Sequence, residues 1–200
     1  MTVRELDGGE VRSEDWYGED LGAAVFRGVT FIDVDLSECT TAGALFQECV
    51  FASCRLNSST HRASAFIACE FRRTSLFDVT LDGCKLDGSV LTECALRALT
   101  VRGGRWRGVT ARGAKLAGID LADVDLGESD LSMADLSRAN LRGARLSGAT
   151  VRGTNLTGAD LRGATLDGVD LTAATLRDTR LDLAGAVWLA ELSGAVVDPG

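Results

Sequence analysis

The feature that most constrains this chain is a large hydrophobic residue that returns at every fifth position. From Leu21 to Leu181 there are 33 such positions, and 30 of them hold Leu, Phe, Val or Trp. The exceptions are Thr41, His61 and Ala111. A helix with 3.6 residues per turn cannot stay in phase with a period of five, so the pattern excludes a helical bundle and predicts a solenoid of short repeats.

A second, smaller residue lies two positions before each large one. Thirty of the 32 residues in this column are Ala, Cys, Ser, Thr, Val or Gly, and only Leu99 and Ile119 are larger. Residues two apart point to the same side of an extended backbone, so both columns are expected to face inward. The remaining residues must turn a corner. In 14 repeats the second residue after the large one is Gly, which accepts the positive φ of a type II turn.

Five residues per side and a corner after each side predict an all-β coil with four walls and 20 residues per turn. Successive turns then pair as parallel ladders about 4.8 Å apart. Residues 20 apart stack on one another, and the oversized Trp106 is compensated by Gly104 and Ala111. The predicted structural core contains Phe26, Phe31, Phe46, Phe51, His61, Phe66, Phe71 and Trp106.

The repeat divides the chain into three parts. Residues 16–182 are expected to form a β-helix of about eight coils, preceded by an irregular cap or tail over residues 1–15. Residues 183–200 are expected to form a short helix and tail, because the segment LAGAVWLAEL is apolar and rich in helix formers. This helix would cover either a second copy of the chain, as a dimerisation element, or the last coil of its own rod. Its candidate interface residues are Leu183, Val187, Trp188 and Leu192.

Charge and composition narrow the classes of function. Acidic residues outnumber basic ones by 29 to 21, and the net charge of −8 argues against direct binding to nucleic acid. No apolar run approaches the roughly 20 residues of a membrane span. Charged residues in the first 30 positions leave no apolar signal-peptide region. We therefore expect a cytoplasmic protein that has no membrane partner.

Cysteine and histidine are the residue types that could carry chemistry here. Every cysteine falls in the inward column of small residues, which favours reduced, buried thiols over disulfides or a metal site. The six are Cys39, Cys49, Cys54, Cys69, Cys84 and Cys94. The lone His61 takes a large-residue position one turn from Thr41, which predicts a buried hydrogen-bonded pair rather than a catalytic base. No phosphate loop or metal-ligand spacing accompanies it, so we expect neither an enzyme nor a cofactor.

The repeat units carry a resemblance to a known family. Ala134-Asp135-Leu136-Ser137-Arg138 and Ala159-Asp160-Leu161-Arg162-Gly163 resemble the unit of pentapeptide-repeat proteins, which implies a right-handed quadrilateral β-helix. The segment from His61 to Thr100 is similar to the MfpA and Qnr type of fluoroquinolone-resistance protein. This resemblance implies a homodimer that binds DNA gyrase, first of all its A subunit, in place of DNA. Such a protein protects gyrase from quinolone-type or other inhibitors. The alternatives are an interaction module for a different partner, and an enzyme that depends on His61.

Acidic side chains in the second half of the chain are the candidates for contact with a cationic partner. A coil with five basic residues and no acid, residues 101–119, is followed by an acidic one. The acidic band consists of Asp120, Asp123, Asp125, Glu128, Asp130, Asp135, Asp160, Asp167 and Asp170. These charges could mimic the phosphates of DNA, or could serve solubility and ion pairing between coils.

Overall fold

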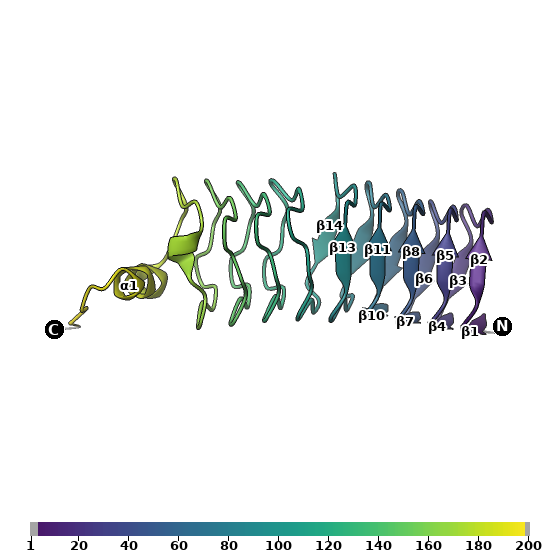
Figure 1. The fold of residues 1–200 in the computed structure, drawn as a ribbon, viewed down its shortest axis with the longest axis horizontal. Coiled ribbons are helices and arrows are strands. Elements are labelled where there is room, and N and C mark those ends of the chain that lie inside the picture. The colour runs from purple at the N-terminus through teal and green to yellow at the C-terminus, as the bar shows by residue number, and fades with distance from the viewer. Residues whose placement is uncertain (1–3, 199–200) are drawn as a thin grey trace.

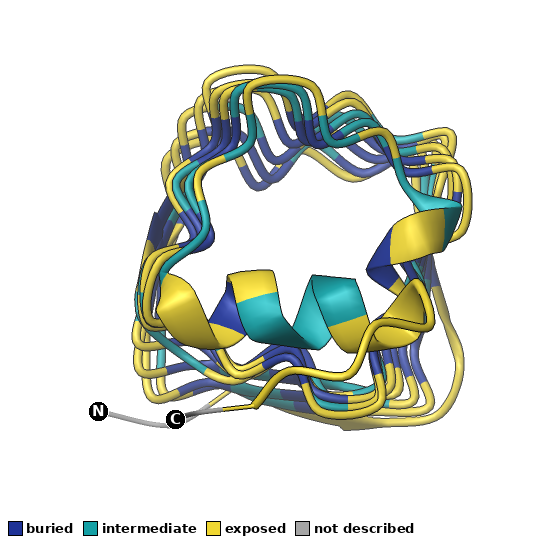
Figure 2. Cartoon of the chain, turned by 90° about the vertical axis from the view of Figure 1, so that its left-hand side faces the viewer, coloured by how far each residue is buried: buried dark blue, intermediate teal, exposed yellow. Residues whose placement is uncertain are grey.

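The coils stack along one axis into a rod, with the two ends of the chain at opposite ends of it (Figure 1). The computed structural model describes residues 4–198. Viewed along the axis, the coils superimpose as a four-sided outline (Figure 2). Residues 20 apart are register partners, as in the pairing of Phe26 with Phe46 and of Phe46 with Phe66. The predicted right-handed quadrilateral parallel β-helix is confirmed.

Three of the four walls carry sheets of short parallel strands. The β1 wall contains β1 (Glu5–Asp7), β4 (Val25–Arg27), β7 (Leu45–Gln47) and β10 (Ala65–Ile67). The β2 wall contains β2 (Glu10–Arg12), β5 (Thr30–Ile32), β8 (Val50–Ala52), β11 (Glu70–Arg72) and β13 (Val90–Thr92). The β3 wall contains β3 (Asp20–Gly22), β6 (Thr40–Ala42), β9 (Thr60–Arg62), β12 (Thr80–Asp82) and β14 (Thr100–Arg102).

The fourth side, which we call the bridge wall, is held by single bridged residues instead of strands. Its bridges join Asp15 to Asp35, Asp35 to Arg55 and Arg55 to Ser75. Beyond β14 all four walls continue in the same way, and the bridge from Asp160 reaches Arg180. The named strands therefore account for about five turns, and bridged coils extend the same stack toward the C-terminus.

Corners are built by a left-handed residue, as predicted, but glycine is not required there. The second residue after each large inward residue has a positive φ, and this holds for Ala63 (45°) and Met133 (61°) as well as for Gly83 (61°). Seventeen non-glycine residues adopt this conformation. The coil geometry therefore imposes the left-handed region even where an L side chain makes it unfavourable.

The interior is filled by the two columns that the sequence predicts. All eight residues of the predicted structural core are buried. The rings of Phe46 and Phe66 stack with centroids 4.7 Å apart and 3° between their planes. Those of Phe51 and Phe71 stack at 4.8 Å and 5°. At the position before Trp106, Gly104 has no alternative, because a Cβ there would lie 2.3 Å from the backbone oxygen of Cys84.

The N-terminal coil starts earlier than the sequence suggested. Strands β1 and β2 both lie within residues 1–15, which were expected to be irregular, and Val11 is buried. Gly8 and Ser13 adopt the corner conformation, with φ of 69° and 52°, so the five-residue frame already operates in this segment. Residues 1–3 of the expected cap, and residues 199–200 of the expected tail, lie outside the described residues.

The C-terminal end of the rod is covered by its own helix. A short 3-10 helix, η1 (Leu171–Ala173), interrupts the last coils, and the predicted helix is present as α1 (Leu183–Leu192). Figure 2 shows α1 lying across the end of the coil stack. The Asp182 carboxylate accepts the backbone N–H groups of Gly185 at 2.9 Å and Gly163 at 2.6 Å, so it caps both the helix and the last coil.

Candidate functional site

An aspartate or asparagine placed before the large residue of a repeat closes the next corner of the coil. The carboxylates of Asp120, Asp130 and Asp135 each accept the backbone N–H group two residues ahead at 3.0 Å. Hydrogen bonds from Ser137 lower the pKa of Asp135 below its usual value. These three members of the acidic band therefore have a structural role, with only part of each carboxylate left for a partner.

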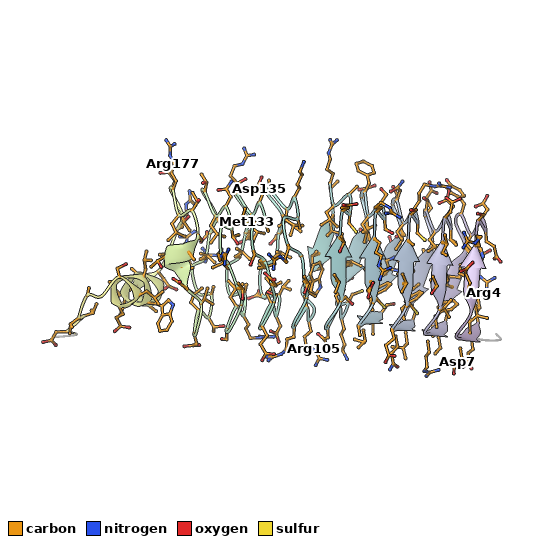
Figure 3. The ribbon with its side chains drawn as sticks, in the orientation of Figure 1. Arg4, Asp7, Arg105, Met133, Asp135 and Arg177 are labelled. Carbon is orange, nitrogen blue, oxygen red and sulfur yellow. The ribbon has the colours of Figure 1, made fainter. Side chains whose placement is uncertain are left out.

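The acidic band does not form one face. Asp120 lies on the β3 wall, Asp125 on the β1 wall, Asp130 on the β2 wall and Asp135 on the bridge wall, so one turn distributes them around the rod. Figure 3 shows labelled charged side chains along opposite edges, with Asp135 on one of them, all directed away from the axis.

Arginines from neighbouring coils pair with much of the band. Arg107 lies 2.5 Å from Glu128, Arg112 lies 3.3 Å from Asp130, and Arg145 lies 3.7 Å from Asp125. The basic coil before the band thus supplies two of its counter-ions, as the ion-pairing alternative predicts. In the same band, Asp167 and Asp170 accept hydrogen bonds from hydroxyl groups of Ser147 and Thr172. Asp123 projects from an exposed corner with a φ of 58°.

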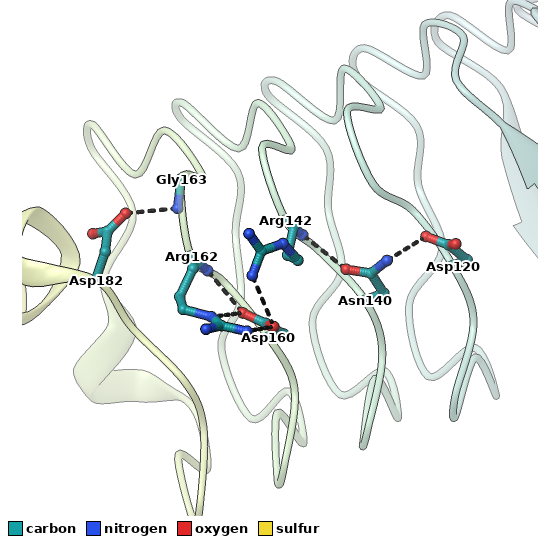
Figure 4. Close-up of polar contacts among 7 residues, drawn as sticks. All are labelled: Asp120, Asn140, Arg142, Asp160, Arg162, Gly163 and Asp182. Atoms are coloured by element: carbon teal, nitrogen blue, oxygen red, sulfur yellow. Dashed lines mark hydrogen bonds and ion pairs between the residues drawn. The ribbon is translucent and has the colours of Figure 1, made fainter.

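The β3 wall shows how far the charges are already satisfied (Figure 4). Asn140 donates its side-chain N–H to Asp120 at 2.8 Å, and the next position in the column is Asp160. The Arg162 guanidinium donates to Asp160 at 2.6 Å, and this hydrogen bond holds the pKa of the carboxyl far below its usual range. Arg142 approaches the same carboxylate at 3.5 Å. This wall is a polar ladder with little excess charge.

The excess negative charge lies at the other end of the rod. The first 50 residues contain 11 acidic and three basic residues, whereas the other 150 contain 18 of each. Five of these acids belong to the corners and faces of the bridge wall in the first two turns. We call this group the acidic wall: Glu14, Asp15, Asp33, Asp35 and Glu38.

The acidic wall has one arginine for its five carboxylates. Asp35 pairs with Arg55 at 3.1 Å, and Ser13 donates its hydroxyl hydrogen to Asp33 at 3.3 Å. A hydrogen bond from Tyr17 to Glu38 raises the pKa of the Tyr17 phenol. The sequence analysis gave these acids no role. The signal that could have identified them is the charge of the first 50 residues taken together with the 20-residue turn, which stacks Asp15 beside Asp35.

His61 is a buried structural group. Its Nδ1 lies 2.8 Å from the Thr41 hydroxyl oxygen and its Nε2 lies 3.0 Å from that of Ser59. Burial lowers the pKa of His61 to about 4, so the ring is neutral at physiological pH. The predicted pairing with Thr41 is confirmed, and it extends to Ser59.

The cysteines follow the packing column. Five are buried, Cys94 is half-buried, and all are free thiols. Burial raises the pKa of Cys39 to about 11. Over residues 4–198 there is no group of three or more His, Cys, Asp or Glu side chains that could hold a metal ion. Over the same range no helix is long and apolar enough to cross a membrane.

Comparison with known proteins gives matches in sequence and in fold. The model of the family described as pentapeptide repeats matches residues 107–143 and 139–178, in eight copies. The pentapeptide repeat protein MfpA of Mycobacterium tuberculosis is 41% identical over 76 residues, which cover 38% of this chain and 42% of the relative. MfpA of Mycolicibacterium smegmatis is 42% identical over 52 residues, which cover 26% and 27%. The chain thus matches less than half the length of either relative.

The structural matches cover nearly the whole rod. A trypsin-treated variant of QnrB1, a plasmid-mediated fluoroquinolone resistance protein, aligns with a TM-score of 0.69 over 97% of this chain and 100% of its own, at 19% identity. Full-length QnrB1 aligns with a TM-score of 0.57 over 94% and 100%, at 17% identity. At such identity the likeness concerns the fold. The repeat, the four-walled rod and these matches together show that the chain is a pentapeptide repeat protein, related to MfpA over part of its length.

Proposed function

We propose that this protein is a non-enzymatic partner of DNA gyrase that occupies the DNA site, on the A subunit, and protects gyrase from quinolone-type or other inhibitors. The observation that carries the proposal is the 41% identity to MfpA over 76 residues. The likeness in fold to QnrB1, named as a fluoroquinolone resistance protein, supports it. The action would take place in the cytoplasm, where gyrase and its DNA are found.

The charge distribution favours the acidic wall as the gyrase contact. A cationic groove that binds DNA attracts a surface with excess negative charge, and this attraction also accelerates association. In this chain the excess lies in the first 50 residues, whereas the rest is balanced. The acidic band remains the competing candidate, since Asp123 and Glu128 are exposed.

A homodimer through α1 is the second part of the proposal. Trp188 donates its ring N–H to the Val169 carbonyl at 2.8 Å, so this side chain is engaged with its own last coil. Leu183 is 81% exposed and Leu192 is 37% exposed, and Val187 lies between them in the helix. These three are the interface candidates that remain free to contact a second copy. Such apolar exposure at the end of a rod favours self-association.

Gyrase assays test the proposal with matched corner variants. Wild-type protein should inhibit supercoiling and reduce quinolone-stabilised DNA cleavage by purified gyrase. Asp33→Asn combined with Glu38→Gln should weaken both effects. Asp123→Asn combined with Glu128→Gln changes two acids at the same corner position, with similar φ values, and should leave both effects intact.

The outcomes separate the contact from the function. A loss of protection confined to the Asp123 and Glu128 pair would move the contact to the acidic band. Wild-type protein without effect at micromolar concentration would refute the gyrase proposal. The protein would then be an interaction module for a different partner, and a pull-down from cell extract should identify that partner instead of gyrase subunits.

A further inference from the structure

The stack of coils has one long interruption between the coil that contains β14 and the next coil. Elsewhere a large inward residue donates its N–H to the carbonyl 19 residues ahead, as Leu76 does to Ala95 and Leu116 does to Asp135, both at 2.8 Å. Among the described residues, seven consecutive bonds of this ladder are not formed here. Their donors would be the N–H groups of Glu93, Leu96, Ala98, Val101, Gly103, Lys115 and Asp120.

The interruption affects two adjacent walls only. On the β1 wall the bridges run from Lys85 to Arg105 and on to Asp125, and on the β2 wall Thr110 continues the column to Asp130. The bridge wall and the β3 wall are the two that open. Figure 1 shows the turn tips along the upper edge evenly spaced except at this point, where they are set farther apart.

Two outsized residues account for the opening. Leu99 and Ile119 are the only members of the small inward column larger than Val, and they lie 20 residues apart, at the same corner of successive coils. Both are buried, at 8% and 7% exposure, in a layer that also contains the ring of Trp106. Because a close-packed interior cannot absorb this extra volume, the two coils separate on the walls where it lies.

The separation creates a continuous cleft. One part has a volume of about 420 Å³ and is lined by Leu91, Glu93, Cys94, Ala95, Leu96, Arg97, Arg112, Gly113, Ala114 and Lys115. The other has a volume of about 410 Å³ and shares Leu96, Arg97 and Lys115 with the first. Of the cations at its rim, Arg112 pairs with Asp130, whereas Arg97 and Lys115 make no ion pair among the described residues.

We propose that this cleft binds an extended acidic segment of a partner protein, added as an extra strand between the two separated coils. One lip presents backbone N–H groups and the other presents the carbonyl groups that they would otherwise reach. A peptide strand carries both donors and acceptors and can satisfy both lips, whereas a phosphate backbone only accepts. The cations Arg97 and Lys115 select carboxylate side chains on that strand. The inference is independent of the gyrase proposal.

A fluorescein-labelled octapeptide of alternating valine and glutamate is the probe. We expect it to bind the full-length protein in fluorescence anisotropy and to slow hydrogen exchange of the amides in residues 93–103 and 112–122. Two matched peptides control for the two sources of affinity. One replaces glutamate by lysine, and the other is N-methylated at alternate residues so that one edge can no longer donate.

Charge-reversed variants test the cations. Arg97→Glu and Lys115→Glu should each weaken binding of the glutamate peptide by about tenfold or more. Arg177→Glu and Lys85→Glu change the same repeat positions elsewhere on the rod and should leave binding unchanged. Half-buried Cys94 lines the cleft, so bound peptide should also protect it from alkylation.

A closing variant tests the cleft itself. Leu99→Ala combined with Ile119→Ala should allow the missing bonds to form, slow exchange of the lip amides and abolish peptide binding. If this variant does not fold, Leu99→Val with Ile119→Val serves the same purpose, since Val already occupies this column at Val79 and Val124.

Each other outcome overturns the proposal. Slow exchange of the lip amides without peptide would mean that the coils close on themselves. Fast exchange without binding at millimolar peptide would leave a cleft that holds water only. Equal binding of the lysine or N-methylated peptide would remove the charge or the strand from the explanation. Displacement of the peptide by a single-stranded oligonucleotide would indicate a phosphate site.

Discussion

At the residue scale, the aspartate of the repeat unit combines a local and a surface role. Its carboxylate closes the corner of its own repeat, as in the bond from the Ser132 N–H to Asp130, and its remaining oxygen faces solvent or a cation. Local hydrogen bonding of this kind is typical of Asp and Asn in turns. An acidic residue in this family position is therefore weak support for a charged contact, and acids at corner positions such as Glu38 are stronger.

Corner strain can be measured with a matched pair of substitutions. Ala63 and Gly83 occupy the same corner of the β3 wall one turn apart, with φ of 45° and 61°. We expect Ala63→Gly to raise the free energy of unfolding by up to ~1 kcal/mol, because it removes left-handed strain. Gly83→Ala should lower it by a similar amount, since a Cβ there meets nothing within 4 Å and adds strain alone. Chemical denaturation measures both, and equal effects of the same sign would contradict the strain argument.

Stability should depend on pH through His61. Its pKa is about 4 in the folded protein and about 6.5 in the unfolded chain, so between these values the unfolded state binds more protons. The free energy of unfolding should therefore fall by up to about 3 kcal/mol as the pH drops from 6.5 to 4. Carboxylates titrate in the lower part of this window, so the measurement is the difference between wild type and His61→Asn. Parallel pH profiles of the two proteins would reject this explanation.

At the element scale, α1 ends the solenoid by contacts on one side and leaves the other side uncovered. A Cβ at Gly185 would lie 3.2 Å from Leu181 and 3.4 Å from Leu166, so glycine lets the helix approach the last coil closely. Asp182 and the Trp188 ring N–H satisfy backbone groups that a further coil would otherwise have paired. The two alternatives left open by the sequence are thus compatible, since one helix has a face for each.

Dimerisation can be separated from helix docking by the choice of substitution. Leu183→Asp should convert a dimer into a monomer without loss of stability, because this side chain is 81% exposed. Trp188→Asp should also lower stability, since it breaks the hydrogen bond to Val169 and the packing beneath it. Light scattering gives the oligomeric state and thermal unfolding gives the stability. A dimer that survives Leu183→Asp would place the interface away from this face of α1.

The sequence predicts the elements well where one residue decides the geometry. The inward columns fixed the core from Phe26 to Trp106, and the loss of the repeat after Leu181 located α1. It predicts less well where volume or charge is shared between coils. The excess bulk of Leu99 and Ile119 is visible in the sequence, but whether rotamers or coil separation absorb it depends on packing across the layer. Similarly, a run of acids looks like a patch until the turn length distributes it over four walls.

At the scale of the whole molecule, the rod behaves as a one-dimensional stack. Each coil contacts only its neighbours, so stability is a sum of local interfaces and the two halves can differ. The N-terminal half has stacked phenyl rings and sheets, whereas the C-terminal half has leucine layers and single bridges. The cleft near Arg97 and Lys115 lies between these halves, where the ladder is weakest.

Removing one ring should expose this division. Phe66→Ala should lower the free energy of unfolding by about 3–5 kcal/mol, because Phe66 is 2% exposed and stacks on Phe46. Hydrogen exchange should accelerate in the coils between β7 and β13 and remain slow over residues 130–165. Leu146→Ala serves as the counterpart in the second half and should show the reverse distribution. Uniform acceleration along the chain in both variants would mean that the rod unfolds as one cooperative unit.

The register of exactly one partner per side chain, 20 residues away, has a consequence for how such a protein can change in evolution. Excising or duplicating one full circuit, for example between Ala139 and Ala159, would return the backbone to the same wall with the same inward residue type. Both termini would keep their caps. The length of the molecule can therefore change in discrete steps of one circuit, and the spacing between its two ends works as a ruler that selection can reset without redesigning either end.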